Sequence, residues 1–517
     1  MTHDIKIKYR IIVIAIFLSA VTSVRAQIKR KTISPDDVII EGSVSDSTVI
    51  LAPGKKISVT LRISTFPANA IVAPAVKYVA EVDSNRHFKL VIPSPANRFY
   101  MRISYSPIGK YHWSTFVDNI YILEKGDRIY CRLSNITFEF SGKGAAKLNC
   151  QSAIYKHQFQ STKQEQELLN AGEWDKAMSF YNYRQDSILK IRLNLVKENE
   201  HSLGREMTNI LIANCYGLRY YASLRSSRAP LGRQRFMAFV NSDGYKSINR
   251  VFKKNIDTSS LIASPNYVDF LFEHILVNDL KGTNGNADTT GGNFRRIYTK
   301  IRSDYSGKIR EKLLITYFLN YKINSAALAF LDDALTLVKS ADYKEILTEI
   351  KRTKSKSSPF YPFELEDDKG KIVRLSDFKV KVVFIDFWFT GCSPCKMLNE
   401  SMKPVLAKFK DNPNVKFVSV SIDADKSRWL KSVASGEYTH PTSINLYAGG
   451  KHSSTDKVHP LISNYNITAY PTVFLLKNGK IYEMGPPRPS PSDENNPEKG
   501  NTQQLISLIN KAIVEKE

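Results

Sequence analysis

Hydrophobic and polar positions divide the chain into stretches with different periodicity. Between about residues 37 and 145, short runs of β-branched and aromatic residues are separated by turn residues, which favours a β-sandwich. These runs are Val38–Ile40, Ile57–Leu61, Phe88–Ile92, Phe99–Ile103 and Ile120–Leu123. From about 149 to 355 the pattern becomes helical, because apolar residues recur at helical spacing and no proline interrupts the stretch from Cys150 to Leu203.

The last stretch alternates strands with helices. Val382–Phe389 is almost continuously apolar, as a strand covered on both faces must be. Elements predicted around it are a hairpin formed by Phe363–Leu365 and Ile372–Arg374, a helix to about 410, the strand Val415–Ile422, a helix from about 426, strands at Val473–Leu476 and Ile481–Glu483, and a final helix from about 502 to 515. We therefore predict a multidomain chain with a β-rich domain at 27–148, a helical domain at 149–356 and an α/β domain at 357–517.

The first 26 residues have the pattern of an export signal. Three basic residues precede the apolar run Ile11–Leu18, and Val24-Arg25-Ala26 places small residues where a signal peptidase cuts. We expect residues 1–26 to be a signal peptide that is cleaved after Ala26, and the mature chain to be periplasmic. The alternative is an uncleaved anchor in the inner membrane, although the apolar run is shorter than the roughly 20 residues that span a bilayer.

The formal net charge is +24, of which the first 26 residues contribute +3. A basic chain suggests nucleic-acid binding. Export argues against that partner, and the sequence contains no arginine-rich arm or zinc knuckle. Peripheral association with an anionic membrane surface stays open, beside the simpler interpretation of a solvated basic surface.

Five cysteines are too few for a disulfide-stapled scaffold. Cys392 and Cys395 are separated by two residues and follow the buried strand, a pattern that indicates a redox pair. Cys392 would begin a helix, where free N–H groups and the helix dipole favour a thiolate. It follows a mobile Thr390–Gly391 approach and is expected to be exposed, with Cys395 one turn deeper. Pro394 fits the first helical turn because its missing N–H costs nothing there.

The cysteines also allow other interpretations. A zinc site needs two more ligands, but there is no second CxxC pair and no histidine at a recognisable ligand spacing, so we expect no metal and no cofactor. A purely structural disulfide between Cys392 and Cys395 would close a very small loop. Cys131 and Cys150 either pair structurally or serve as small buried apolar side chains.

Two blocks of sequence resemble thioredoxin. Ile385-Asp386-Phe387-Trp388 followed by Cys392-x-Pro394-Cys395 is close to its active-site stretch, and Ala469-Tyr470-Pro471-Thr472 resembles its cis-proline loop. The export signal and the lead-in from Phe363 to Phe378 are similar to those of TlpA-like thiol-disulfide oxidoreductases, and the preceding domains resemble those of multidomain bacterial members. The resemblance covers about residues 357–517 and implies a thioredoxin fold there.

The resemblance also implies roles for three residues near the cysteine pair. Cys392 corresponds to the attacking cysteine and Cys395 to the resolving one. Asp386, six residues before Cys392, matches the buried acid of thioredoxin; desolvation would raise its pKa and let it take the proton of the resolving thiol. The alternative is an aspartate that hydrogen bonds merely satisfy.

Four further residues would shape the substrate groove. Pro471 corresponds to the cis-proline, which would leave the Tyr470 backbone free to pair with a substrate strand. Trp388 and Pro394 belong to the same predicted groove. This chain has Gly391 where thioredoxin has a tryptophan before the first cysteine, so an aromatic shield is absent there. The long loop from Thr439 to Asn466 is expected to cap the groove.

These features predict an extracytoplasmic oxidoreductase that reduces protein disulfides, since the dipeptide Ser393-Pro394 resembles the reducing Gly-Pro type. Its partners would be disulfide-containing proteins and, by family analogy, a membrane thiol electron donor. One alternative is a thiol peroxidase, although the threonine that peroxiredoxins place three residues before the reactive cysteine is Phe389 here, and Thr390 is one residue off. Another is a non-catalytic partner-binding protein.

Overall fold

The computed structural model describes residues 33–45, 56–66, 75–106, 119–134, 138–157, 162–228, 233–251, 257–285, 292–321, 324–378, 381–449, 459–465, 467, 469–491 and 500–515. The predicted signal peptide lies outside these residues. The chain forms two compact units, one made of 24–320 and 332–346, the other including 321–331 and 347–517. The separate β-rich and helical domains expected from the sequence stay a prediction. Among the described residues, no helix has the length and apolar character required to cross a membrane.

Strands of the larger unit form two four-stranded sheets, with the orders β4-β1-β7-β8 and β3-β2-β5-β6. The strands are β1 (Val38–Val44), β2 (Ser58–Ser64), β3 (Val76–Glu81), β4 (His87–Ile92), β5 (Arg98–Ser106), β6 (Tyr121–Glu124), β7 (Arg128–Leu133) and β8 (Phe138–Lys143). In β1 and β7 every second residue is buried, so each of these strands turns one face to a core. A helical and a sheet region are therefore both present, while the packing of the two sheets as a sandwich stays a prediction.

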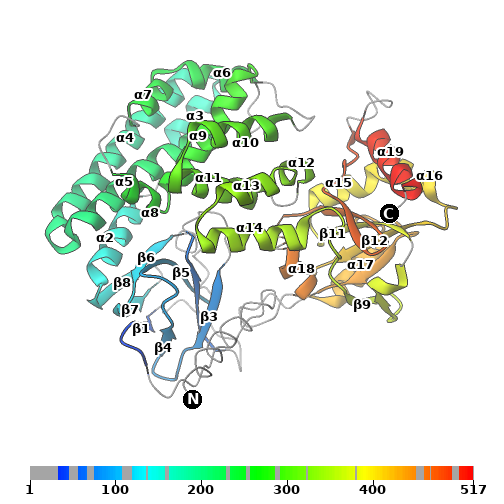
Figure 1. The fold of residues 1–517 in the computed structure, drawn as a ribbon, viewed down its shortest axis with the longest axis horizontal. Helices are drawn as coiled ribbons and strands as arrows, with labels where there is room; N and C mark the ends of the chain where they lie inside the picture. The colour runs from blue at the N-terminus through cyan, green and yellow to red at the C-terminus, as the bar shows by residue number, and fades with distance from the viewer. Residues whose placement is uncertain are drawn as a thin grey trace, which may run out of the picture. The chain divides into compact units, whose positions relative to one another are not determined.

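The helical part of this unit begins directly after β8 (Figure 1). Its helices are α2 (Ala145–Lys156), α3 (Lys163–Asn170), α4 (Trp174–Glu198), α5 (Glu200–Ser227), α6 (Arg233–Asn241), α7 (Asp243–Val251), α8 (Thr258–Ala263), α9 (Tyr267–Gly282), α10 (Gly292–Asp304), α11 (Gly307–Tyr321) and α13 (Leu331–Leu337). The short helix α12 (Ser325–Leu328) belongs to the smaller unit, and α14 (Ala341–Lys354) passes from one unit into the other at residue 347. Cys131 and Cys150 are buried free thiols. Of the two interpretations left open by the sequence, the structural disulfide is therefore wrong and the small buried side chain is confirmed.

The smaller unit is built on a seven-stranded sheet with the order β10-β9-β13-β12-β11-β14-β15. Its strands are β9 (Glu364–Asp367), β10 (Ile372–Arg374), β11 (Val382–Trp388), β12 (Val415–Ser421), β13 (Ile444–Tyr447), β14 (Thr472–Lys477) and β15 (Lys480–Met484). β11 lies at the centre, parallel to β12 and antiparallel to β14. The helices are η1 (Leu375–Phe378), α15 (Ser393–Ser401), α16 (Lys403–Phe409), α17 (Lys426–Ser435), α18 (Pro460–Tyr465) and α19 (Asn501–Val514).

Alternation along β11 separates two cores. Val383, Ile385 and Phe387 belong to the core that also contains Tyr465 of α18. Val382 and Phe384 belong to the opposite core, which includes residues of α15, α16 and α19; Figure 1 shows α16 and α19 close together beside the sheet. Asp386 continues the second face, because side chains two residues apart share a face of a strand.

The segment from Thr439 to Asn466 is not simply a loop. It contains the strand β13, which pairs with both β12 and β9, and the helix α18. Leu446 and Leu461 are fully buried in the core that contains Val383, Ile385 and Phe387. This burial is why these short apolar stretches form regular structure. Capping of the groove by this segment stays a prediction, since residues 450–458 lie outside the described part.

Candidate active site

The cysteine pair lies at the end of the central strand. Cys392 is the N-cap of α15, Pro394 occupies the first turn, and the Cys395 backbone N–H donates to Cys392 Sγ at 3.2 Å. The two cysteines form a disulfide with Cα atoms 5.3 Å apart. A sulfur at this N-cap receives a backbone donor and faces the positive end of the helix dipole, and both stabilise a thiolate after reduction.

The expected difference in exposure between the cysteines is wrong for this disulfide form. Cys392 is 4% exposed and Cys395 is 3% exposed. Both pack in one cluster with Trp388 and Trp429, and Tyr438, Tyr447 and Tyr470 border it. Aromatic side chains therefore cover both sulfurs, whereas Ser393 and Pro394 between them are exposed.

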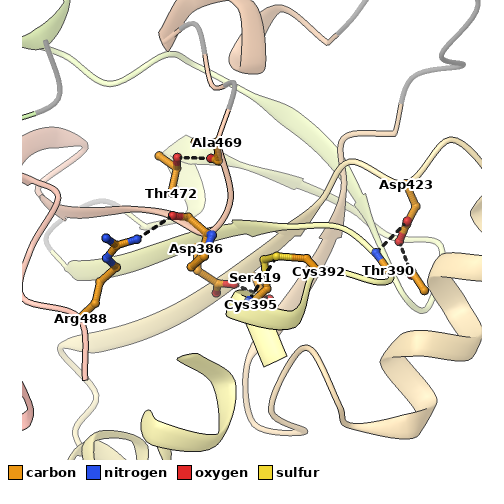
Figure 2. The surroundings of a disulfide bond; sticks show 10 residues. Asp386, Thr390, Cys392, Cys395, Ser419, Asp423, Ala469, Thr472 and Arg488 are labelled. Carbon is orange, nitrogen blue, oxygen red and sulfur yellow. Dashed lines mark hydrogen bonds between the residues drawn. A yellow bond between two sulfur atoms is a disulfide. The ribbon is translucent and has the colours of Figure 1, made fainter. Parts of the chain in front are cut away.

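Asp386 lies on the strand face turned toward α15, and Figure 2 shows its side chain pointing toward the disulfide end of that helix. In the sheet register Asp386 stands between Val473 of β14 and Ser419 of β12. Ser419 Oγ donates to Asp386 Oδ2 at 3.2 Å. Desolvation raises the pKa of the Asp386 carboxyl group to about 7, although the Ser419 hydrogen bond acts in the opposite direction. An acid with this pKa exchanges a proton readily near neutral pH.

The second predicted block lies beside the first. The Tyr470–Pro471 peptide bond is cis. Thr472 Oγ1 donates to the Ala469 carbonyl at 2.7 Å, and the Arg488 guanidinium donates to the Pro471 carbonyl at 3.1 Å (Figure 2). The first bond joins two residues of the cis-proline loop, and the second ties the loop to the segment that follows β15. Tyr470 is half-buried and Pro471 is buried.

Trp388 does not line the surface groove in which the sequence placed it. Its side chain is fully buried and stacks on Tyr438 with ring centroids 5.3 Å apart. Strand alternation accounts for this position, since residue 388 continues the face of Asp386 beneath the cysteine pair. The exposed aromatic residue of this stretch is Phe389, which meets Tyr470 edge to face at 5.4 Å.

Gly391 has a φ of 99°, in the region that favours glycine. A tryptophan here, as in thioredoxin, would be strained in this backbone conformation. Other elements supply aromatic side chains instead, because Phe389 contacts Tyr470 and Trp429 stacks on Tyr447 near the sulfurs. The missing shield is thus partly replaced by residues from β13, α17 and the cis-proline loop.

The sequence interpretation missed a polar network that anchors Thr390. Asp423 follows β12, and its carboxylate accepts from the Thr390 backbone N–H at 3.0 Å and from the Thr390 hydroxyl at 2.7 Å (Figure 2). Ser421 Oγ donates to the same carboxylate at 2.9 Å, and Ser432 Oγ lies 2.7 Å from Thr390 Oγ1. The approach to Cys392, expected to be mobile, is therefore held by hydrogen bonds.

The contact between Thr390 and Asp423 could have been predicted from the order of the elements in the sequence. β11 and β12 are adjacent parallel strands, so residues that follow their carboxyl ends meet at one edge of the sheet. Thr390 follows the first strand and Asp423 the second. Within the described ranges, no three histidine, cysteine, aspartate or glutamate side chains gather in a way that could hold a metal ion.

Comparison with known proteins identifies the class of this fold and site. Residues 379–481 match a family model described as thioredoxin-like. The thiol-disulfide oxidoreductase ResA of Bacillus subtilis strain 168 is 30% identical over 135 residues, which cover 26% of this chain and 69% of the relative. The ResA protein of Bacillus thuringiensis strain Al Hakam is 31% identical over 123 residues, 24% of this chain and 64% of the relative.

Solved structures of thiol-disulfide oxidoreductases are also similar to part of the chain. The thioredoxin domain of a Bacteroides vulgatus thiol-disulfide oxidoreductase is 24% identical, covering 31% of this chain and 97% of that domain, with a TM-score of 0.25. A Chlorobium tepidum protein described as a putative thiol:disulfide interchange protein DsbE is 27% identical over 30% of this chain and 97% of that one, with a TM-score of 0.23.

The chain belongs to the TlpA-like thiol-disulfide oxidoreductases of the thioredoxin superfamily. It spans 64% of the length of the first ResA relatives. The shared region corresponds to the unit that carries Cys392 and Cys395, and residues before it are outside the family model.

Proposed function

We propose that this protein reduces disulfide bonds of other proteins outside the cytoplasm through its Cys392–Cys395 dithiol. The observation that carries the proposal is the arrangement of the pair: Cys392 at the N-cap of α15, Cys395 one turn inside, and the Asp386 carboxyl group with its pKa raised to about 7 on the strand face turned toward this helix. Its membership of the thiol-disulfide oxidoreductases supports the same chemistry.

The reaction begins with the reduced pair. The Cys392 thiolate attacks one sulfur of the substrate disulfide, that bond breaks, and the departing sulfur leaves as a thiolate that takes a proton from water. Asp386 in its carboxylate form then removes the proton of the Cys395 thiol. The Cys395 thiolate attacks Cys392 Sγ, the mixed disulfide breaks, and the second substrate sulfur leaves as a thiolate that takes a proton from water, while Asp386 returns its proton to water.

The products are a reduced substrate and the Cys392–Cys395 disulfide. Another turnover requires an external dithiol, which gives up two electrons and two protons and is itself oxidised. We propose that a membrane thiol carrier supplies it.

Export is supported by the leader pattern of the first 26 residues. The proposal is a periplasmic protein cleaved after Ala26; an inner-membrane anchor is the alternative. Fractionation of cells that express the full chain, with N-terminal sequencing of the product, distinguishes these outcomes. A product that starts at Gln27 in the periplasm supports the proposal, and an uncleaved chain in the membrane supports the anchor.

The assignment of attack and resolution is tested by trapping. Cys395→Ser leaves the mixed disulfide between Cys392 and substrate without its nearby nucleophile, so we expect partners to accumulate on non-reducing gels. Cys392→Ser is the matched control and should trap almost none. Equal trapping by the two variants would contradict the assigned roles.

Two assays separate the function from its alternatives. Reduction of insulin disulfides by the full chain with dithiothreitol is expected for a reductase and absent for a purely partner-binding protein. Peroxide consumption tests the thiol peroxidase. The hydroxyl of Thr390 is bonded to Asp423 and near Ser432, an arrangement that gives no support to a peroxidase site at Cys392.

A further inference from the structure

Four hydrogen bonds gather on the residue two positions before Cys392. Thr390 donates from its backbone N–H and from its hydroxyl to the Asp423 carboxylate, at 3.0 and 2.7 Å. Because the Thr390 hydroxyl proton goes to this carboxylate, Ser432 is the donor across the 2.7 Å contact between the two hydroxyls. Arg428 of α17 donates to the Thr390 carbonyl at 3.1 Å.

The carboxylate that receives these bonds is itself fixed. Asp423 is 5% exposed, and fully buried Ser421 donates to its Oδ2 at 2.9 Å while accepting from its backbone N–H at 3.1 Å. Hydrogen bonds to an ionised acceptor in protein surroundings are stronger than neutral ones. Asp423 is therefore a rigid attachment point for Thr390.

The anchored residue controls a short turn. The Cys392 backbone N–H donates to the Phe389 carbonyl at 3.2 Å, and Gly391 within the turn has a φ of 99°. One end of the turn carries Phe389, which touches Tyr470 of the cis-proline loop, and the other carries the sulfur of Cys392. Displacement of Thr390 would therefore move both the nucleophile and the exposed aromatic ring beside it.

We propose that Asp423 is a positioning residue for Cys392, and that its carboxylate sets the turn Phe389–Cys392 through Thr390. This inference rests on the proposed thiol-disulfide exchange at Cys392. It assigns Asp423 no contact with substrate. Its effect is to keep Cys392 Sγ at the N-terminus of α15 after the disulfide opens, where the Cys395 N–H and the helix dipole stabilise the thiolate.

An electrostatic role of Asp423 predicts a different result from a positioning role. Charged or titratable groups around the turn and the cysteine pair include Asp423 itself, Arg428 from α17, Tyr447 from β13, Tyr438 and Tyr470, with Asp386 on the strand face turned toward α15. Removing a nearby negative charge alone would favour the Cys392 thiolate, whereas loss of position disfavours it. Thr390→Val separates the two, because it keeps the charge and the side-chain shape but deletes the hydroxyl that binds Asp423.

The experiment measures the alkylation rate of Cys392 by iodoacetamide across pH, in the full reduced chain with Cys395→Ser so that Cys392 is the reactive thiol of the site. We compare Asp423→Ala, Thr390→Val and Thr390→Ser. The positioning role predicts that alkylation near neutral pH slows by about ten-fold in the first two variants, less than the roughly hundred-fold loss that a full 1 Å misplacement can cause. Thr390→Ser retains the hydroxyl and should restore the rate to near wild type.

Asp425→Ala is the control for simple destabilisation. Asp425 caps α17 through the Ser427 and Arg428 backbone N–H groups, and does not contact the turn. Its loss weakens the same helix, but the Cys392 alkylation profile should stay unchanged. Equal slowing in Asp425→Ala and Asp423→Ala would overturn the positioning role, as would faster alkylation in Asp423→Ala together with an unchanged rate in Thr390→Val.

A second readout separates this inference from the proposed function. Insulin reduction by Asp423→Ala and Thr390→Val, with Cys395 intact, should show a lower kcat and, because Phe389 shifts, a raised KM. If wild type does not reduce insulin, the proposed function fails, while the alkylation profiles still decide the role of Asp423. If wild type reduces insulin and the profiles of all variants coincide, the positioning inference alone fails.

Discussion

Replacing Asp386 by asparagine tests the raised pKa and the proton-transfer role together. The carboxyl group has its pKa raised from 3.8 to about 7, principally by desolvation. Each pKa unit corresponds to about 1.4 kcal/mol, so the ionised carboxylate destabilises the folded state by about 4 kcal/mol relative to the unfolded chain. Asparagine keeps the size of the side chain and cannot ionise.

The sign of the pH dependence follows from the two pKa values. Between about pH 4 and pH 7 the folded state holds a proton that the unfolded state has released. The stability of the wild type therefore falls as pH rises through this window, and the loss is complete above about pH 7. In Asp386→Asn this component is absent, so the variant should be more stable than wild type at pH 8 and similar to it at low pH.

Urea unfolding of the oxidised full chain at pH 4 and pH 8 measures this difference. Ser419→Ala is the matched control, because it keeps the carboxyl group but deletes the hydroxyl that donates to Asp386 Oδ2. Since that hydrogen bond favours the charged form, its loss should raise the pKa further and steepen the fall in stability. If the free energy of unfolding changed with pH in the same way for Asp386→Asn and for wild type, the raised pKa of Asp386 would be refuted.

Activity gives the second half of the test. Above pH 7 the wild-type carboxylate can accept the Cys395 proton, and its loss should slow insulin reduction about a hundred-fold, within the range for general-base catalysis. Below about pH 6 Asp386 is largely protonated and the two proteins should converge. A rate ratio that stays constant between pH 5 and pH 9 would remove Asp386 from the proton transfer, whatever the stability curves show.

Two further predictions concern the turn before Cys392 and the folding of the smaller unit by itself. Gly391→Ala should destabilise the oxidised protein by roughly 1–2 kcal/mol in urea unfolding, because the φ of 99° is unfavourable for a residue with a Cβ. A steric clash adds nothing, since the nearest atom to the new Cβ, on Arg428, is 3.8 Å away. A negligible loss of stability would show that the turn relaxes freely. A chain that starts at residue 357 should fold alone and retain activity. A chain that starts at Leu347 should be more stable by roughly 1–3 kcal/mol, because it also contains buried Lys354, which donates to the Asn464 carbonyl at 3.2 Å. Calorimetry of both fragments checks this, and an unfolded shorter chain would contradict it.

Much of the smaller unit could be predicted from sequence because its signals are local. The apolar run of β11 and the turn at Asn478–Gly479 between β14 and β15 specify their structures over a few residues. In the other unit, the strands β3 and β7 were missed. No side chain of β3 is fully buried, and Val76 and Val79 are exposed, so its residues lack the alternation that marks a strand with one buried face. β7 does alternate, with every second residue buried, so its pattern could have been recognised.

The site was predictable where it depends on neighbours in sequence and less so where it depends on strand order. Cys392, Pro394 and Cys395 lie on one helical turn, so their spacing is sufficient. The contact of Thr390 with Asp423 requires β11 and β12 to be adjacent and parallel. Trp388 is buried because both faces of β11 are covered, and the stacking of Tyr438 on it joins residues about 50 positions apart in the sequence.

The smaller unit is assembled from separate pieces of the chain, since residues 321–331 belong to it, 332–346 do not, and 347 onward do again. Ser325 Oγ lies 3.4 Å from the Met484 carbonyl, and Leu328 packs against the core of the sheet. Exchange of gene segments between relatives at a single crossover before Pro359 would thus carry over Cys392 and Cys395 but leave Ser325 and Leu328 behind. Recombination that preserves this oxidoreductase unit intact is expected to favour breakpoints upstream of residue 321.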